Sequence, residues 1–218
     1  MSKFRILLVA LALALGSYTL ASAVAEMGSS DQPTFPLDPA AISAPSSRVP
    51  NWLKVLAPFR SDLEASNALA AALQAIQSGK KNAPEASIEV LRAQERVRQL
   101  LTIAPYNPEL WLALALLQAQ RDPRDPLLSE ALKMTYFTAP NDAQLMPVRL
   151  DTATSFDALA DPDVRDLVRG DVRLMLTRTP ELRTAVVSAY RRASNLGRTF
   201  LEEAVQSIDP SFALNPRR

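Results

Sequence analysis

The chain has no cysteine and no histidine among its 218 residues. Without cysteine it has no disulfide, no thiolate nucleophile and no N-terminal thiol that a lipid could modify. Without histidine it lacks the commonest general base near neutral pH and, with cysteine also absent, the usual ligands of zinc and haem. An enzyme built from this chain would depend on carboxylates, lysine, tyrosine or hydroxyl groups. We therefore expect a non-enzymatic protein with no metal and no cofactor.

Glycine is also scarce, with 5 residues in the whole chain. The residues that dominate instead are strong helix formers, namely Ala, Leu, Arg, Glu and Gln. Runs of Val, Ile or Thr that alternate with polar residues, as strands require, are missing. The sequence predicts an all-α fold.

An excess of positive charge is missing as well. Lys3 and Arg5 are two of the 24 cations, and the 23 anions all lie after residue 25, so the chain beyond that point holds 22 cations and carries a formal charge of −1. A nucleic-acid partner would favour a basic excess, so we expect none.

The first 25 residues have the pattern of an export signal. Lys3 and Arg5 precede the apolar run "ILLVALALAL", and the small-residue patterns "ASA" and "AVA" follow it. The alternative is an uncleaved anchor, since residues 6–25 are about one bilayer span long. Either reading places the rest of the chain outside the cytoplasm, in the periplasm or tethered to the inner membrane and facing it.

Residues 26–50 contain five prolines and five serines. Such a segment buries too little apolar surface to offset its ordering entropy, so we expect a disordered linker ahead of a folded domain at 51–218.

Four Pro residues in that domain follow a residue that can cap a helix: Asn107-Pro108, Asp125-Pro126, Asp161-Pro162 and Thr179-Pro180. Proline is favoured at the first helical position, directly after a capping side chain. Together with the apolar periodicity, these signals predict eight helices near 61–78, 85–103, 108–120, 126–138, 142–156, 162–177, 180–193 and 195–207. Short connections between them favour antiparallel hairpins.

Pro105 and Pro140 end successive hairpins 35 residues apart, and Leu110 and Leu145 hold equivalent places. A period of about 34 residues with two helices in each unit is typical of tetratricopeptide arrays.

The chain resembles tetratricopeptide repeats most clearly over 105–140. Trp111, Leu114 and Ala115 match the first helix of that motif, whereas Gln118 stands where the motif has Tyr. The residues that match the second helix and terminal proline of the preceding unit are Ala93, Val97 and Pro105. The resemblance implies a short, degenerate stack of helical hairpins. The segments "APYNPELWLALALL" and "ALKMTYFTAPND" also resemble, more weakly, small exported helical proteins associated with exopolysaccharide biosynthesis or export.

The predicted helix at 108–120 is apolar on nearly every side, which is typical of a helix buried among neighbours. We expect Trp111 to lie in the core; the alternative is that its ring stacks on a ligand.

Arg165, Arg169 and Arg173 recur every four residues and share one helix face. They are candidates for binding an anionic polysaccharide or an acidic partner, since Arg binds carboxylates in a bidentate manner. The alternative is a solvated face whose positive charge Asp161, Asp166 and Asp171 balance.

A second candidate surface is the apolar segment "NWLKVLAPF". Its Trp52 and Phe59 would dock on a partner or on the membrane; the alternative is that they pack on the first hairpin.

Paired carboxylates occur at Asp161 and Asp163 and at Glu202 and Glu203. We interpret the first pair as acids favoured by the helix dipole and the second as solvent-exposed, and assign no catalytic residue.

Helical arrays bind partners over extended surfaces. We therefore expect an interaction module of the cell envelope that binds a protein partner; the weaker resemblance implies an accessory to polysaccharide biosynthesis or export. The alternatives are an oligomer-forming structural subunit and an envelope enzyme that uses carboxylates.

Overall fold

The computed structural model describes residues 4–5, 7–9, 11–13, 15–16, 19, 34–39, 61–79 and 84–214. Throughout these residues the regular backbone is helical and contains no strand, which confirms the predicted all-α class. The described residues between 4 and 19 have helical backbone. Among the described helices, none combines the length and the apolar character needed to span a bilayer.

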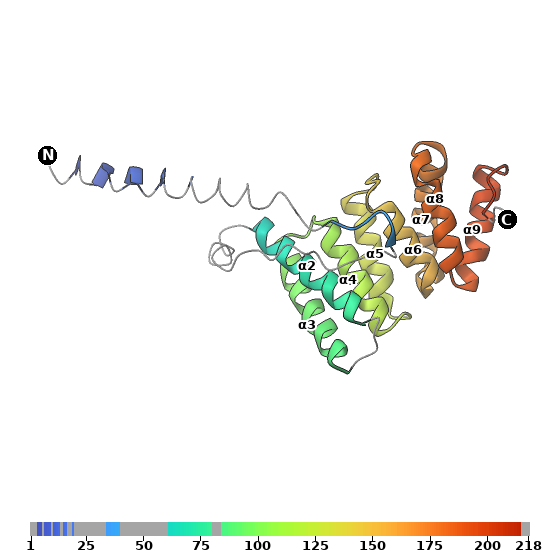
Figure 1. Ribbon diagram of the computed structural model, residues 1–218, viewed down its shortest axis with the longest axis horizontal. Coiled ribbons are helices and arrows are strands. Elements are labelled where there is room, and N and C mark those ends of the chain that lie inside the picture. The colour runs from blue at the N-terminus through green and yellow to red at the C-terminus, as the bar shows by residue number, and fades with distance from the viewer. Residues whose placement is uncertain are drawn as a thin grey trace.

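Eight α-helices form the folded body between residues 61 and 208 (Figure 1). In chain order they are α2 (Ser61–Gly79), α3 (Pro84–Leu101), α4 (Pro108–Arg121), α5 (Pro126–Thr138), α6 (Met146–Ser155), α7 (Pro162–Thr177), α8 (Arg183–Arg192) and α9 (Asn195–Ile208). Two single-turn 3₁₀ helices, η4 (Asp157–Ala160) and η5 (Pro180–Leu182), precede α7 and α8.

Three of the four predicted proline-marked starts carry the expected cap. The side chains of Asn107, Asp125 and Asp161 accept hydrogen bonds from backbone N–H groups of the first turn, at 3.0, 2.9 and 2.9 Å. At the fourth start, Thr179 makes no such bond, and the chain forms η5 before α8 begins.

The first half of the body consists of two hairpins. Helix α2 packs against α3 and α4 against α5, while α4 also contacts α2, α3 and α6. The almost wholly apolar sequence of α4 suits this position, because Leu110, Leu112 and Leu117 are completely buried. The expectation that this helix is buried among its neighbours is confirmed.

The second half does not continue this pairing. Helix α6 packs chiefly against α8 and also against α7 and α9, while α7 contacts α5 and α9 (Figure 1). The regular succession of hairpins therefore ends after α5.

The predicted start of the fifth helix at residue 142 is wrong by four residues. Residues 141–145 form turns, in which the Asp142 side chain accepts from the N–H of Gln144 at 2.9 Å. Pro147 has no N–H to donate back to residue 143, so it stands in the first turn of α6.

The start of α9 lies directly against the end of α6. The N–H and hydroxyl groups of Ser194 donate to the carbonyl oxygen of Thr154 at 2.9 and 3.0 Å. A Cβ atom on Gly197 would lie 2.1 Å from that same oxygen, so this approach requires a residue without a side chain.

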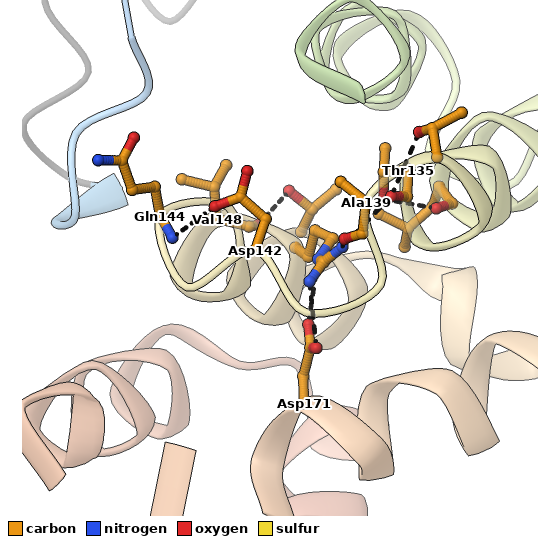
Figure 2. Close-up of polar contacts among 10 residues, drawn as sticks. Thr135, Ala139, Asp142, Gln144, Val148 and Asp171 are labelled. Carbon is orange, nitrogen blue, oxygen red and sulfur yellow. Dashed lines mark hydrogen bonds and ion pairs between the residues drawn. The ribbon is translucent and has the colours of Figure 1, made fainter. Parts of the chain in front are cut away.

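Residues 34–39 lie on the body, within the segment predicted to be a disordered linker. Phe35 is 3% exposed and belongs to the hydrophobic core. The two views place this segment beside the first turn of α6 (Figures 1 and 2). Helix α6 begins more than 100 residues further along the chain. The predicted linker therefore includes six residues that pack on the body; its other residues lie outside the described part.

Candidate functional sites

A buried ion pair joins α6 to α7. Arg149 Nε donates to Asp171 Oδ2 at 3.1 Å, and Arg149 Nη2 donates to Asp171 Oδ1 at 3.2 Å (Figure 2). The Arg149 side chain is 0% exposed and the Asp171 side chain 2%. The two parallel bonds fix the guanidinium and the carboxylate in one geometry.

The remaining groups around Arg149 come from the end of α5. Arg149 Nη1 donates to the carbonyl oxygens of Ala139 at 2.8 Å and Thr135 at 3.3 Å. The guanidinium carbon also lies 4.3 Å from the centre of the Tyr136 ring, a cation–π contact. One side chain therefore connects α5, α6 and α7.

Burial controls the protonation of this cluster. Burial raises the pKa of the Asp171 carboxyl to about 7, although Arg149 acts in the opposite direction. Burial, followed by the nearby Asp171 charge, also raises the pKa of Tyr136 well above its ordinary value. The Tyr136 hydroxyl is buried and makes no well-oriented hydrogen bond within the described residues. The cluster is closed to solvent, so its role is structural.

A second buried polar row crosses the first half of the body. Gln94 of α3 donates to Gln118 of α4, and Gln118 in turn donates to Asp125, the cap of α5. This hydrogen-bonded row joins α3, α4 and the cap of α5.

The turns at Pro105 and Pro140 share one backbone hydrogen bond, although the helices around them begin and end at different positions. In each, the alanine before the proline bonds back to the preceding helix, through Ala104 N–H to Leu100 O and Ala139 N–H to Thr135 O. Trp111 packs against the core and is only partly buried, and its Nε1 donates to Pro105 O at 2.7 Å. The Trp111 ring therefore stabilises the first of these turns.

The three candidate arginines of α7 differ in their surroundings. Arg173 is exposed, whereas Arg169 pairs with Asp166 at 2.6 Å and lies 5.8 Å from the centre of the Phe200 ring. Arg165 is half-buried, and its Nε has no hydrogen-bond partner among the described residues.

The aspartates expected to balance this face do so only in part. Asp166 is the one that pairs with an arginine of the face. Asp161 instead binds Lys133 at 3.1 Å, and Asp171 points inward to Arg149.

The carboxylate pairs do not come together in one site. Asp161 caps α7, as predicted, with Asp163 in its first turn. Glu202 is exposed on α9 and accepts a hydrogen bond from the Tyr190 hydroxyl at 2.5 Å, and Glu203 is exposed beside it. Trp52 and Phe59, the predicted docking residues, lie outside the described residues.

The contact made by residues 34–39 is the functional feature that the sequence did not indicate. Phe35 and Pro39 are buried, while Leu37 between them is 56% exposed. Asp38 Oδ1 lies 3.9 Å from Nη1 of Arg192 on α8, and Nε of the same Arg192 donates to Asp151 of α6 at 2.7 Å. A buried aromatic side chain and a charge contact with Arg192 of α8 thus hold this segment on the body.

Comparison of the chain with protein families, curated sequences and solved structures gave no match.

Proposed function

We propose that the chain is a non-enzymatic helical scaffold of the cell envelope that binds a protein partner through an extended segment of that partner. One observation carries the proposal: the body already holds a short segment that belongs to no α-helix, residues 34–39, with Phe35 buried in its core. A surface that buries an aromatic side chain of a short segment has one of the features of a peptide-binding site.

The location follows from the N-terminal pattern. Residues 1–25 combine two cations with an apolar run and small-residue cleavage patterns. We propose export to the periplasm, with cleavage or with retention of residues 6–25 as an inner-membrane tether. Cell fractionation and mass spectrometry test this: the protein should start at Val24 or Glu26, or keep its intact N-terminus in the membrane fraction. An intact protein in the cytosol would contradict it.

Site-specific cross-linking in cells tests the partner. A photoreactive residue at Arg191, which is exposed next to the docking site on α8, should capture a protein. The matched position is Glu89, which is exposed on α3 in the other half of the body and should not capture the same protein. The purified partner should then be displaced by a peptide of residues 31–41. Equal capture at both positions, or binding that the peptide does not affect, would refute a partner site on α6 and α8.

A structural, self-associating subunit is the second candidate. Helices α4 and α5 are joined by four residues and pack together, so the turn before α4 and the end of α5 lie at one end of the body. That end carries three exposed apolar side chains, since Ile103, Tyr106 and Phe137 are 67, 85 and 68% exposed. If they form a subunit interface, light scattering should show an oligomer that the double substitution Tyr106→Ser and Phe137→Ser dissociates.

A further inference from the structure

The turn before α4 and the end of α5 form an uncharged, apolar part of the surface. Ile103, Tyr106 and Phe137 are 67, 85 and 68% exposed there, and the packing of α4 on α5 brings them to one end of the body. No charged residue occurs at 102–107 or at 137–141. Exposed apolar side chains that lie together without charges between them are typical of a contact surface. We call these three side chains the apolar end.

The first of the two turns has a fixed backbone. Trp111 packs against the core, and its Nε1 donates to Pro105 O at 2.7 Å. The N–H groups of Ile103 and Ala104 donate to Leu100 O at 3.0 and 2.8 Å. Backbone groups that are already hydrogen-bonded can enter an apolar environment at a lower cost. The turn can therefore place its two exposed apolar side chains in an apolar layer without breaking these hydrogen bonds.

The area of the apolar end is small for a protein interface. At about 200 Å² for each fully accessible side chain of this size, the exposed fractions amount to about 440 Å². A standard interface buries about 800 Å² on each partner and needs a surface of complementary shape. A lipid bilayer adapts to the shape of the protein, and binding to it scales with the apolar area that it covers. The area therefore favours a bilayer over a second copy of the chain.

The N-terminal part of the chain supplies a second apolar element. Its described residues between 4 and 19 have helical backbone, and the large apolar side chains among them are exposed. Stable attachment to a membrane usually takes two such signals. Residues 34–39 lie beside the first turn of α6, and Arg149 of α6 donates to Ala139 O at the end of α5 (Figures 1 and 2). This N-terminal segment thus meets the body near the end that carries Phe137.

We propose that Ile103, Tyr106 and Phe137 are a membrane-contact surface, which inserts into the interfacial layer of a lipid bilayer. Tyr106 suits this layer because its ring is apolar and its hydroxyl is polar. Since the two turns carry no charge, the surface recognises the apolar boundary of the bilayer and not a charged headgroup. The inference rests on the proposed envelope location, which supplies the membrane. It adds that the folded body itself lies on the membrane, with the start of α4 and the end of α5 towards the lipid.

A fluorescent label at single positions of the full chain tests this surface. The chain has no cysteine, so Phe137→Cys and Leu127→Cys each accept one environment-sensitive label. Leu127 is the matched control, because it is 50% exposed in the first turn of α5, at the opposite end of the same helix. The probes are vesicles of phosphatidylcholine alone and of phosphatidylcholine with phosphatidylglycerol. With both, the label at residue 137 should become brighter and shift its emission to the blue, and the label at residue 127 should not change.

A second substitution tests the contribution of the neighbouring turn. Tyr106→Ser, added to the labelled Phe137→Cys chain, removes a side chain that is 85% exposed and so leaves the core intact. The lipid concentration at half-maximal response should rise by about tenfold, because one fewer aromatic side chain is buried in the bilayer. Salt should have no effect, since no charge is paired. Equal responses at residues 127 and 137, or no response at either, would overturn the proposal. A response that requires phosphatidylglycerol and disappears with salt would overturn it as well.

The remaining outcomes separate this inference from the proposed function. If the chain floats with the vesicles while the label at residue 137 does not respond, the N-terminal tether stands and this inference fails. If that label responds but cell fractionation finds the intact protein in the cytosol, the proposed location fails and the membrane-contact surface stands. An oligomer in light scattering that Tyr106→Ser dissociates would assign the apolar end to a second copy of the chain and would overturn the proposal.

Discussion

Arg149 and Asp171, which are 22 residues apart in the chain, form a two-bonded ion pair in an interior where neither side chain is more than 2% exposed. Removing two charges from water is costly, and an isolated buried pair often contributes little net stability. Here the guanidinium also satisfies two backbone carbonyl groups of α5. The ion pair therefore acts mainly by determining that α5, α6 and α7 pack together, and it contributes less to the net free energy of unfolding.

The first prediction is a strong loss of stability when one partner is removed. Arg149→Met leaves the buried Asp171 carboxyl without its cationic partner and removes the hydrogen bonds of Arg149 to the carbonyls of Thr135 and Ala139. We expect the free energy of unfolding to fall by about 3–5 kcal/mol, measured by urea denaturation. Adding Asp171→Leu to Arg149→Met should restore part of the loss, because no unpaired charge then remains. A double variant as unstable as the sum of the two single variants would contradict this reading.

The second prediction concerns pH. Asp171 has a pKa of about 7 in the folded protein, against an ordinary value of 3.8. Between those values the folded state holds a proton that the unfolded chain has released, so the free energy of unfolding should fall as pH rises. One such proton gives at most about 1.4 kcal/mol per pH unit. Urea denaturation from pH 5 to 8 measures the slope, and Asp171→Asn should reduce it. The chain has no histidine to obscure the result.

The third prediction compares two glycines within helices. Gly197→Ala places a Cβ 2.1 Å from Thr154 O, so α9 must move away from α6 and the melting temperature should fall. Gly170 of α7 is the control, because a Cβ there meets nothing within 4 Å. Gly170→Ala should stabilise the protein by about 0.5–1 kcal/mol, since alanine is the better helix former. The same sign of change at both positions would rule out the close contact.

The fourth prediction separates the arginines of α7. Arg173→Glu should change stability by less than about 0.5 kcal/mol, because the side chain is exposed. Arg169→Glu should destabilise more, since it places a carboxylate beside Asp166 and removes the cation from the Phe200 ring. If the face binds an anionic polysaccharide, Arg173→Glu should abolish that binding and leave the melting temperature unchanged. Binding that survives the substitution would exclude this role.

The helix starts could be predicted because their causes are local. Asn107 and Asp125 precede prolines, and each caps the turn that follows it. The same reasoning misplaced the start of α6, where Asp142 has the character of a cap but stabilises a turn. Pro147 was the decisive signal, because a missing N–H is tolerated only in the first turn of a helix.

The buried ion pair of Arg149 and Asp171 depends on tertiary packing, but the sequence contains one indication of it. Asp171 was assigned to the exposed arginine face by its charge. Its spacing from Val164, Val168 and Met175 places it within the apolar stripe of α7, and all four residues are buried. A charged residue in an apolar stripe indicates a buried partner, but the spacing does not identify Arg149.

The docked segment was missed for a different reason. Composition averages over a window, and the prolines and serines of 26–50 outweigh a single phenylalanine. Residues 34–39 lie beside the first turn of α6, and Asp38 contacts Arg192 of α8; both helices are more than 100 residues further along the chain. No local pattern contains these contacts.

Because Arg149 of α6 binds backbone carbonyls of α5, the body cannot be divided into independent units between these two helices. In repeat arrays each unit contacts only its neighbours, so units can be gained or lost with small effects on the rest. Here the last turn of α5 obtains its hydrogen-bond donor from α6, and that donor is itself held by α7. A cut at the Pro140 turn would separate the carbonyls from their donor. The repeated turns therefore mark a periodicity of sequence and not a boundary between modules, and the two halves should unfold in one cooperative step.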